Sequence, residues 1–259
     1  MFNLVRGAFR YGMVALVIGL GTVVILLTGW LPWRVQGARP CSWVATGMSR
    51  LFLWVFNIRL TCEEPEKFRR HSGFIFPNHT SYLDIVVLMS IFPMRWLAAA
   101  EIGQWPFIGR ISRSIDTVFV QREDKNSRTT TRAALADVAL FPPICLFPEG
   151  GIVPDQTLGP FRYGAFEIAR AQGAAYLPAA IVYVEHDILA WRTDLDESVM
   201  AAAWRVACQP RPLHAHLVAL PPVQPGPEDD PRVLAAAAHG AIWGALQAAY
   251  AGQSPPASN

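Results

Sequence analysis

Hydrophobic and polar positions divide this chain into an apolar N-terminal part and a longer part in which short apolar runs alternate with polar stretches. Residues 11–33 read YGMVALVIGLGTVVILLTGWLPW and contain no charged side chain. As a helix this run spans about 34 Å, which is enough to cross a hydrocarbon core of about 30 Å. It is too long for the apolar region of a signal peptide, and no clear cleavage site follows it. The pattern therefore predicts a retained membrane helix, with Trp30 and Trp33 at the membrane interface.

A second apolar segment, residues 42–60, carries Arg50 and Arg59 and is rich in aromatic side chains. Such a segment is expected to lie along the membrane interface. Because arginines lie on both sides of the first helix, their distribution does not fix its orientation. The first helix either crosses the bilayer or forms, with the second segment, a hairpin inserted into one leaflet. Residues 1–60 are thus predicted to be a membrane anchor of one or two helices.

From residue 61 to residue 252 the pattern is that of a globular domain in which strands and helices alternate. Strands are expected at 73–78, 95–100, 116–122, 143–150, 177–186 and 213–222. Helices are expected at 81–92, within 101–115, and at 127–140, 164–173, 197–208 and 233–250. Several strand segments are apolar throughout, which indicates burial on both faces. The pattern predicts an α/β domain with a central, mostly parallel sheet, and residues 253–259 are expected to be a disordered tail.

Composition supports an association with membranes, because 52% of the residues are hydrophobic and only 16% are charged. Soluble domains have about 25% charged residues. The net charge of +2 is too small to indicate a nucleic-acid partner, although it suits an anionic membrane surface. The four cysteines are far apart and lack zinc-binding spacing, which predicts free thiols in a reducing compartment.

The segment FPNHTSYLD, residues 76–84, places a histidine and an aspartate five positions apart between two apolar runs. Residues five apart do not share one face of a continuous helix. If the helix begins at Thr80 or Ser81, however, His79 lies in the turn before it and Asp84 can reach back to the imidazole. A carboxylate bound to one ring nitrogen fixes the tautomer and leaves the other nitrogen as a base. Amides at the start of the helix would also lie close to any developing negative charge.

The same segment has a purely structural interpretation. Ser81 and Asp84 match the spacing of a capping box, in which the two side chains satisfy amides at the start of a helix. His79 would then be an ordinary turn residue.

A second candidate lies in FPEGG, residues 147–151. Its two glycines allow close approach of the backbone to a ligand, and Glu149 is placed to bind hydroxyl groups of an acceptor. The alternative is an ordinary turn with an exposed glutamate.

Five blocks taken together resemble the glycerolipid acyltransferases, the family of the bacterial 1-acylglycerol-3-phosphate acyltransferases and the lyso-ornithine lipid acyltransferases. The blocks are NHTSYLD (78–84), the strand that ends at Arg122, FPEG (147–150), FRYGA (161–165) and LPAA (177–180). The resemblance covers residues 70–222, and the N-terminal membrane helices are also typical of the family.

The resemblance implies a twisted sheet wrapped by helices, and a general base at His79 that is oriented by the carboxylate of Asp84. It implies transfer of a fatty acyl group from acyl-CoA or acyl carrier protein to the hydroxyl of a lysolipid. Since a thiolate is a good leaving group, neither a metal nor a cofactor beyond this co-substrate is expected. Substrate-binding roles follow for Asn78, Arg122, Glu149, Gly150, Gly151 and Arg162.

The chain departs from the family at one position. Enzymes of the family that form phosphatidate usually continue the third block as Glu-Gly-Thr-Arg, whereas Gly151 and Ile152 follow Glu149-Gly150 here. The arginine expected to hold the acceptor phosphate is therefore absent. Either Arg122, Lys125, Arg128 or Arg162 replaces it, or the acceptor has no phosphate monoester. Residues 101–109 and 117–122 look more like the lyso-ornithine lipid branch, so both acceptors stay open.

Two other classes of function are weighed against this one. A metal-dependent hydrolase would use His214 and His216, whose alternation puts both rings on one face of a strand. A non-catalytic membrane adaptor would form no product. The expected partners are a lysolipid, acyl-CoA or acyl carrier protein, and the bilayer. The expected location is the membrane, with the catalytic domain on the cytoplasmic face of the inner membrane.

Overall fold

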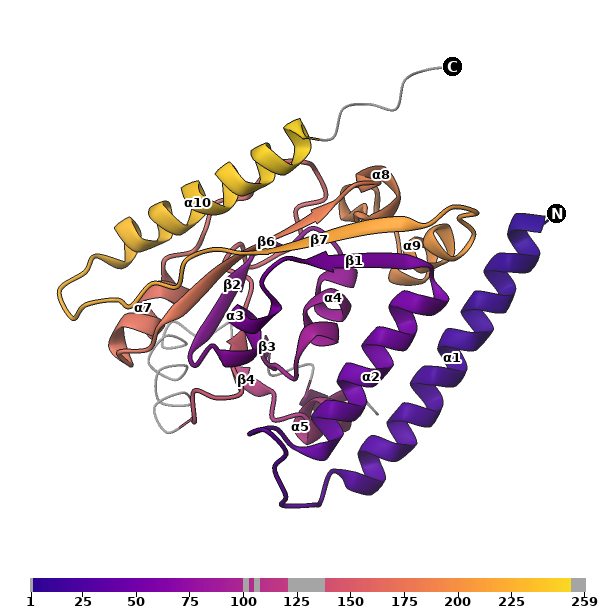
Figure 1. The fold of residues 1–259 in the computed structure, drawn as a ribbon, viewed down its shortest axis with the longest axis horizontal. Helices are drawn as coiled ribbons and strands as arrows, with labels where there is room; N and C mark the ends of the chain where they lie inside the picture. The colour runs from indigo at the N-terminus through magenta and orange to yellow at the C-terminus, as the bar shows by residue number, and fades with distance from the viewer. Residues whose placement is uncertain (1, 100–102, 105–107, 121–137, 253–259) are drawn as a thin grey trace.

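The computed structural model describes residues 2–99, 103–104, 108–120 and 138–252, which form a seven-stranded sheet with helices on both faces (Figure 1). The strands are β1 (Ile58–Cys62), β2 (Phe74–Pro77), β3 (Arg95–Ala99), β4 (Val118–Val120), β5 (Ile144–Cys145), β6 (Tyr176–Tyr183) and β7 (Leu213–Ala219). Their order is β1-β7-β6-β2-β5-β3-β4, and each neighbouring pair is parallel except β6 and β7. The predicted α/β fold with a mostly parallel sheet is confirmed.

Most of the predicted helices are present. The helices are α1 (Phe2–Thr28), α2 (Pro40–Val55), α3 (Pro65–Arg70), α4 (Leu83–Ile91), α5 (Ile108–Ser114), α7 (Gly164–Ala171), α8 (His186–Leu189), α9 (Val199–Ala207) and α10 (Pro231–Ala251), with a short 3-10 helix, η2 (Thr193–Leu195). The helix predicted for residues 127–140 lies largely outside the described residues, as does the predicted tail. The short helices α3 and α8 were not predicted, because neither is long enough to show a periodic pattern.

Helices α1 and α2 form a hairpin whose members lie side by side in Figure 1. Helix α1 begins at Phe2 rather than Tyr11 and ends at Thr28 rather than Trp33, because Gly29 and Pro32 follow it. An 18-residue window of this helix has a mean hydropathy of 2.3, so the helix is long and apolar enough to cross a membrane. Gly21 allows the two helices to approach closely, since a Cβ atom there would overlap the side chain of Met48.

The segment predicted to lie along the interface, residues 42–60, divides into two elements. Helix α2 ends at Val55, and the edge strand β1 begins at Ile58 and pairs with β7. Only Phe56 and Asn57 lie between them, and Asn57 adopts a left-handed backbone conformation with φ of 57°. The strand was missed because its apolar residues continue the helix pattern without a break.

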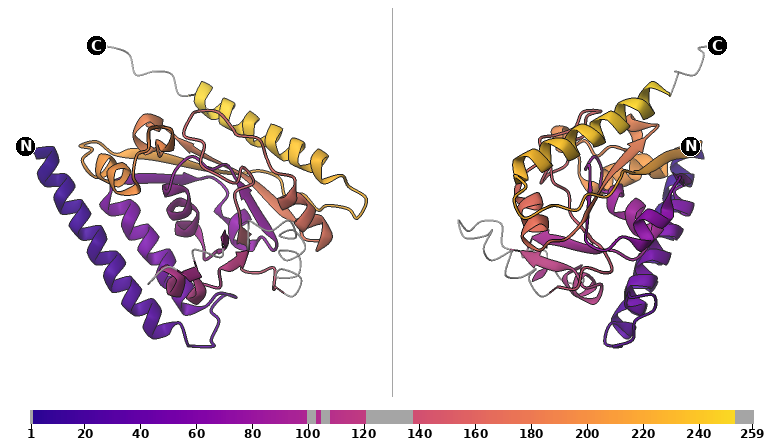
Figure 2. Two further views of the ribbon diagram at one scale, coloured as in Figure 1. Left: turned by 180° about the vertical axis from the view of Figure 1, so that it is seen from behind. Right: turned by 60° about the vertical axis from the view of Figure 1, so that its left-hand side comes forward.

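Each face of the sheet has its own apolar core. Ile75 of β2 packs in one cluster with residues of α2, α4 and β7, whereas Phe74 and Phe76 pack in another with residues of α7 and α10. Strand β6 is buried along its whole length beside β2. In Figure 2 the yellow helix α10 and the indigo to purple helices α1 and α2 lie on opposite sides of the sheet. The carboxyl end of β2 therefore opens between the central strands and the helix layer that contains α2 and α4.

Candidate active site

His79 lies just beyond the carboxyl end of β2, in the turn that leads to α4. This is the position at which ligands bind in open α/β sheets. Helix α4 begins at Leu83, later than the predicted start at Thr80 or Ser81, because residues 80–82 form the turn that brings Asp84 back toward the imidazole. The predicted proximity of the two side chains is therefore obtained with a longer turn.

Asp84 is completely buried, and its carboxylate accepts four hydrogen bonds. Oδ2 accepts from His79 Nδ1 at 2.8 Å and from the amides of Thr80 and Ser81 at 2.7 and 2.8 Å. Oδ1 accepts from the hydroxyl of Tyr183 at 2.6 Å. The catalytic and capping interpretations of FPNHTSYLD are thus compatible, since the same carboxylate satisfies the turn amides and orients the histidine.

Tyr183 belongs to β6 and was not predicted as a site residue. Burial raises the pKa of its hydroxyl well above the ordinary value, and the neighbouring charge of Asp84 raises it further. The hydroxyl therefore stays protonated and donates to Asp84. Nothing in the apolar run that contains Tyr183 marks this contact, because it depends on the pairing of β6 with β2.

The imidazole of His79 is fixed on several sides. Nδ1 lies against the acceptor Asp84 and so carries the proton, which leaves Nε2 with a free lone pair. The ring stacks on Phe147, with centroids 3.8 Å apart and planes inclined by 9°. The backbone amide of His79 donates to Glu149 Oε1 at 3.0 Å, and its carbonyl accepts from Val153 at 2.8 Å. In the described part of the chain Nε2 makes no hydrogen bond, and 14% of the side chain is exposed.

Glu149 is buried, which excludes the exposed turn glutamate that was the alternative for this motif. Burial raises the pKa of its carboxyl group to about 8; the amide of His79 lowers it and the charge of Asp84 raises it. Oε2 lies beside Gly159 and, among the described residues, has no well-formed hydrogen bond. Glu149 therefore contacts the backbone of the catalytic candidate His79 and lies against Gly159.

The stacked rings of His79 and Phe147 lie between two cavities. The first, of about 590 Å³, is mainly apolar and is bounded by α1, α2, α4, α5 and β3. The second, of about 410 Å³, is lined by the glycine turn and by Thr193. Both volumes lie within the range of about 300–1,000 Å³ typical of ligand pockets. One ring can therefore face two different ligands.

Gly150 and Gly151 both line the second cavity, as their prediction as substrate-binding residues requires. Gly150 has a φ of +74°, and the guanidinium of Arg162 packs against it, so that a Cβ atom there would lie 2.7 Å from Arg162 Cζ. Gly151 faces open space. Arg162 itself is exposed at the rim of this turn.

Among the predicted substrate-binding residues that the structure describes, Asn78, Glu149 and Arg162 do not line either cavity. Asn78 is buried, and its amide group exchanges two hydrogen bonds with the backbone of Ile181, at 2.7 and 3.0 Å. It joins the end of β2 to β6 and thereby supports the turn that follows. Arg122 lies outside the described residues.

Most of the amides expected to face negative charge at the start of α4 are already used. Thr80 and Ser81 donate to Asp84, and the amide of Leu83 lies 3.3 Å from the hydroxyl of Ser81. Among the residues that the structure covers, the amides of Gly151 and Ile152 make no hydrogen bond, and both residues line the second cavity with His79. The glycine turn therefore supplies free backbone donors beside His79.

The histidines considered as metal ligands lie elsewhere. Nδ1 of His214 donates to Glu185 Oε1 at 3.0 Å, and His216 contacts Thr61 at the edge of the sheet. In the described ranges no group of three or more histidine, cysteine, aspartate or glutamate side chains is placed to hold a metal ion.

Residues 59–182 match the family model described as Acyltransferase. The chain is 29% identical to the lyso-ornithine lipid O-acyltransferase of Pseudomonas aeruginosa over 70% of this chain and 68% of the relative. It is 27% identical to the 1-acyl-sn-glycerol-3-phosphate acyltransferase of Neisseria meningitidis over 53% of this chain and 54% of the relative, so that it spans about half the length of this second protein.

Its fold is similar to the crystal structure of the 1-acyl-sn-glycerophosphate acyltransferase PlsC from Thermotoga maritima. The TM-score is 0.69 with 17% sequence identity, and the match covers 98% of each chain. At this identity the similarity concerns the fold alone. It includes the N-terminal helices, because nearly the whole chain is aligned.

Proposed function

We propose, from the match of residues 59–182 to the acyltransferase family model, that the protein transfers a fatty acyl group from an acyl thioester to the hydroxyl of a lysolipid. One observation carries the proposal. The imidazole of His79, oriented by Asp84, lies between an apolar cavity and a glycine-lined cavity. This is the arrangement needed to bring an acyl chain and a hydroxyl acceptor to the same base.

His79 acts as the general base. Nε2 removes the proton of the lysolipid hydroxyl as the oxygen attacks the thioester carbonyl, and the thiolate leaves when the tetrahedral intermediate collapses. Asp84 holds Nδ1 and stabilises the imidazolium that forms. The nucleophile comes from the substrate, so no serine or cysteine of the chain is required.

The apolar cavity takes the acyl chain of the thioester. Its walls include Met48, Phe52 and Met89, and it extends from His79 toward α1. A chain that enters this cavity carries its carbonyl carbon beside the imidazole. Burial of the chain supplies about 0.8 kcal/mol per CH₂ group, so binding comes mainly from parts of the substrate that do not react.

The glycine turn stabilises the oxyanion and borders the acceptor. The amides of Gly151 and Ile152 line the same cavity as His79 and have no other partner in the described structure. Loss of one hydrogen-bond donor placed in this way lowers the rate about 10²–10³-fold. Gly150 and Arg162 form the rim at which the head group of the lysolipid binds.

The acceptor is lyso-ornithine lipid or 1-acylglycerol-3-phosphate. Relatives of both kinds are similar to this chain, and no lysine or arginine lines the glycine-lined cavity within the described ranges. The donor is acyl-CoA or acyl carrier protein, and no further cofactor takes part. Because both donors occur in the cytoplasm, the catalytic domain lies on the cytoplasmic face of the inner membrane, held there by the hairpin of α1 and α2.

The test offers the purified full-length protein one acyl thioester together with each of the two lysolipids, and identifies the product by mass. Thiol release that depends on one lysolipid, with the matching diacyl product, is the expected result. His79→Ala should abolish turnover while the thermal unfolding midpoint is retained. A protein that forms no product with either lysolipid, or a His79→Ala variant as active as the wild type, would rule out this function.

A further inference from the structure

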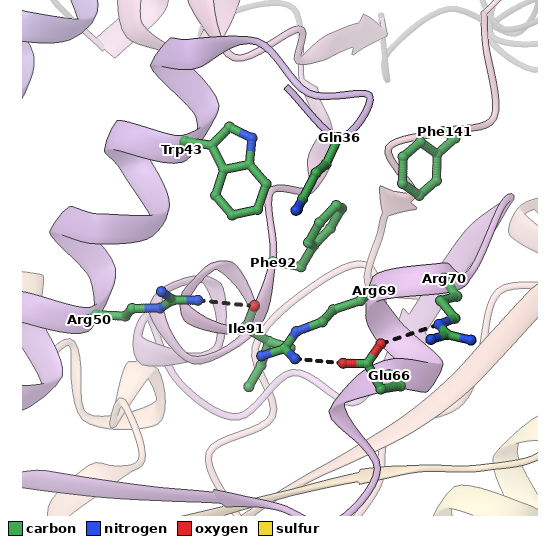
Figure 3. Close-up of a pocket in the computed structure, with 9 residues that line it drawn as sticks. All are labelled: Gln36, Trp43, Arg50, Glu66, Arg69, Arg70, Ile91, Phe92 and Phe141. Carbon is green, nitrogen blue, oxygen red and sulfur yellow. Dashed lines mark hydrogen bonds and ion pairs between the residues drawn. The ribbon is translucent and has the colours of Figure 1, made fainter. Parts of the chain in front are cut away.

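A third cavity, of about 490 Å³, lies between α2 and α3 and shares no lining residue with the two cavities at His79 (Figure 3). Its floor is formed by the end of α4, at Ile91 and Phe92. Asp84 lies in the first turn of that helix, about 10 Å away along the axis at ~1.5 Å per residue. The third cavity is therefore separate from the candidate active site.

One wall of this cavity is aromatic. The rings of Trp43 and Phe92 meet edge to face with centroids 5.3 Å apart, and Phe92 and Phe141 follow with centroids 5.8 Å apart. In Figure 3 the three rings gather at one end of the cavity, away from the charged side chains of α3. This end suits the apolar part of a ligand.

The opposite wall is basic. Arg69 and Arg70 both contact a single carboxylate, Glu66, at 2.6 and 3.3 Å, and Arg50 holds the carbonyls of Ser90 and Ile91 at the end of α4. The lining of the cavity thus contains three guanidinium groups and one carboxylate, which leaves an excess positive charge. Nη2 of Arg69 and both Nη atoms of Arg70 make no hydrogen bond in the described structure, so they remain free to bind an anion.

The cavity is also close to the predicted membrane surface. Trp43, Arg50 and Trp54 follow one stripe of α2 at spacings of seven and four residues, and Trp54 is 75% exposed. Tryptophan and arginine on one face of a helix are typical of the head-group region of a bilayer. Helix α2 itself packs along the apolar helix α1.

We propose that this cavity binds an anionic phospholipid. Arg69 and Arg70 hold the phosphate through the charge-assisted, bidentate contacts that guanidinium groups favour. The glycerol and the upper part of the acyl chains lie against Trp43, Phe92 and Phe141. The bound lipid is a site of attachment to the bilayer beside the α1–α2 hairpin, and its binding does not require catalysis.

The experiment titrates detergent-solubilised full-length protein with phosphatidylglycerol and counts the bound lipid by native mass spectrometry. Phosphatidylcholine with the same acyl chains and inorganic phosphate are the parallel titrations. Every measurement is repeated in the His79→Ala background, so the result is independent of turnover. We expect one site that prefers phosphatidylglycerol to phosphatidylcholine and does not retain inorganic phosphate.

Variants of α3 locate the site. Arg69→Gln combined with Arg70→Gln should weaken phosphatidylglycerol binding about tenfold or more, whereas Glu66→Gln should strengthen it by removing the competing carboxylate. The matched control is Lys67→Gln with Arg59→Gln, which removes the same charge from nearby positions that do not line the cavity. Equal weakening in the control, wild-type affinity in the arginine variant, or retention of inorganic phosphate equal to that of the lipid would each overturn the proposal.

Discussion

The carboxyl group of Glu149 provides a test of how this active site is held together. The family resemblance assigns it to the acceptor, whereas in the structure it is buried and binds the backbone amide of His79. Replacement by glutamine keeps an oxygen that can accept from this amide and removes the ability to become charged. The substitution therefore separates the ionisation of Glu149 from its hydrogen bond.

The effect on stability follows from the pKa. Burial raises the pKa of Glu149 to about 8 from an ordinary value of 4.5, so the folded protein binds a proton that the unfolded chain has lost at intermediate pH. A raised pKa gives stability that is fully present below pH 4.5 and is lost as the pH rises through about 8. The contribution of Glu149 to the free energy of unfolding falls by at most about 1.4 kcal/mol per pH unit. At about 2–4 °C per kcal/mol for a chain of this size, the thermal midpoint of Glu149→Gln relative to the wild type should rise by at most about 3–6 °C per pH unit.

The assay is thermal unfolding of both proteins in the same detergent from pH 5.5 to pH 8. Glu228→Gln is the matched control, because Glu228 is exposed and its substitution should give no such trend. Glu149→Ala should lower the turnover number, because the amide of His79 loses its acceptor, while Glu149→Gln retains most of it. A difference in midpoint between Glu149→Gln and the wild type that stays constant over this pH range would refute the reasoning.

Three further substitutions test the site. Asp84→Asn should lower the turnover number by ~10² or more, because an amide cannot accept all the hydrogen bonds that Oδ1 and Oδ2 receive; steady-state kinetics measure this, and an unchanged rate would contradict the orienting role. Tyr183→Phe should reduce the free energy of unfolding by about 1–3 kcal/mol, measured by denaturant titration, and should lower the turnover number more than it alters KM. Ala45→Trp should fill the apolar cavity and shift the preference toward shorter acyl thioesters, measured as the ratio of kcat/KM for two chain lengths. Leu51→Trp, at a half-exposed position of the same helix outside the cavity, should leave this ratio unchanged.

Local patterns were sufficient for the central elements. Strands β2 and β6 are apolar throughout, and the helix after FPNHTSYLD follows directly from its length and its polar start. The spacing of His79 and Asp84 also predicted their contact, because only the intervening turn is needed to bring them together. Features that depend on a few neighbouring residues could thus be predicted.

Contacts between distant segments could not be predicted in this way. Tyr183 reaches Asp84 only because β6 pairs with β2, with Pro77 opposite Ala179. The burial of Glu149 depends on the way the glycine turn packs beneath the amide of His79. Strand β1 continues the apolar pattern of α2, and only its pairing with β7, more than a hundred residues later in the chain, marks it as a strand. Each of these features is set by tertiary pairing, which a local pattern does not encode.

The short junction between α2 and β1 has a consequence for how such an enzyme would meet its substrate. With only Phe56 and Asn57 between the helix and the edge strand, and with Phe56 buried, the sheet has no flexible tether to the hairpin. Once the hairpin is inserted, the height of His79 above the lipid layer is fixed. Under the proposed function, substrate search would then be two-dimensional, since the protein would diffuse laterally as one body and would process only hydroxyl groups that lie at that single depth.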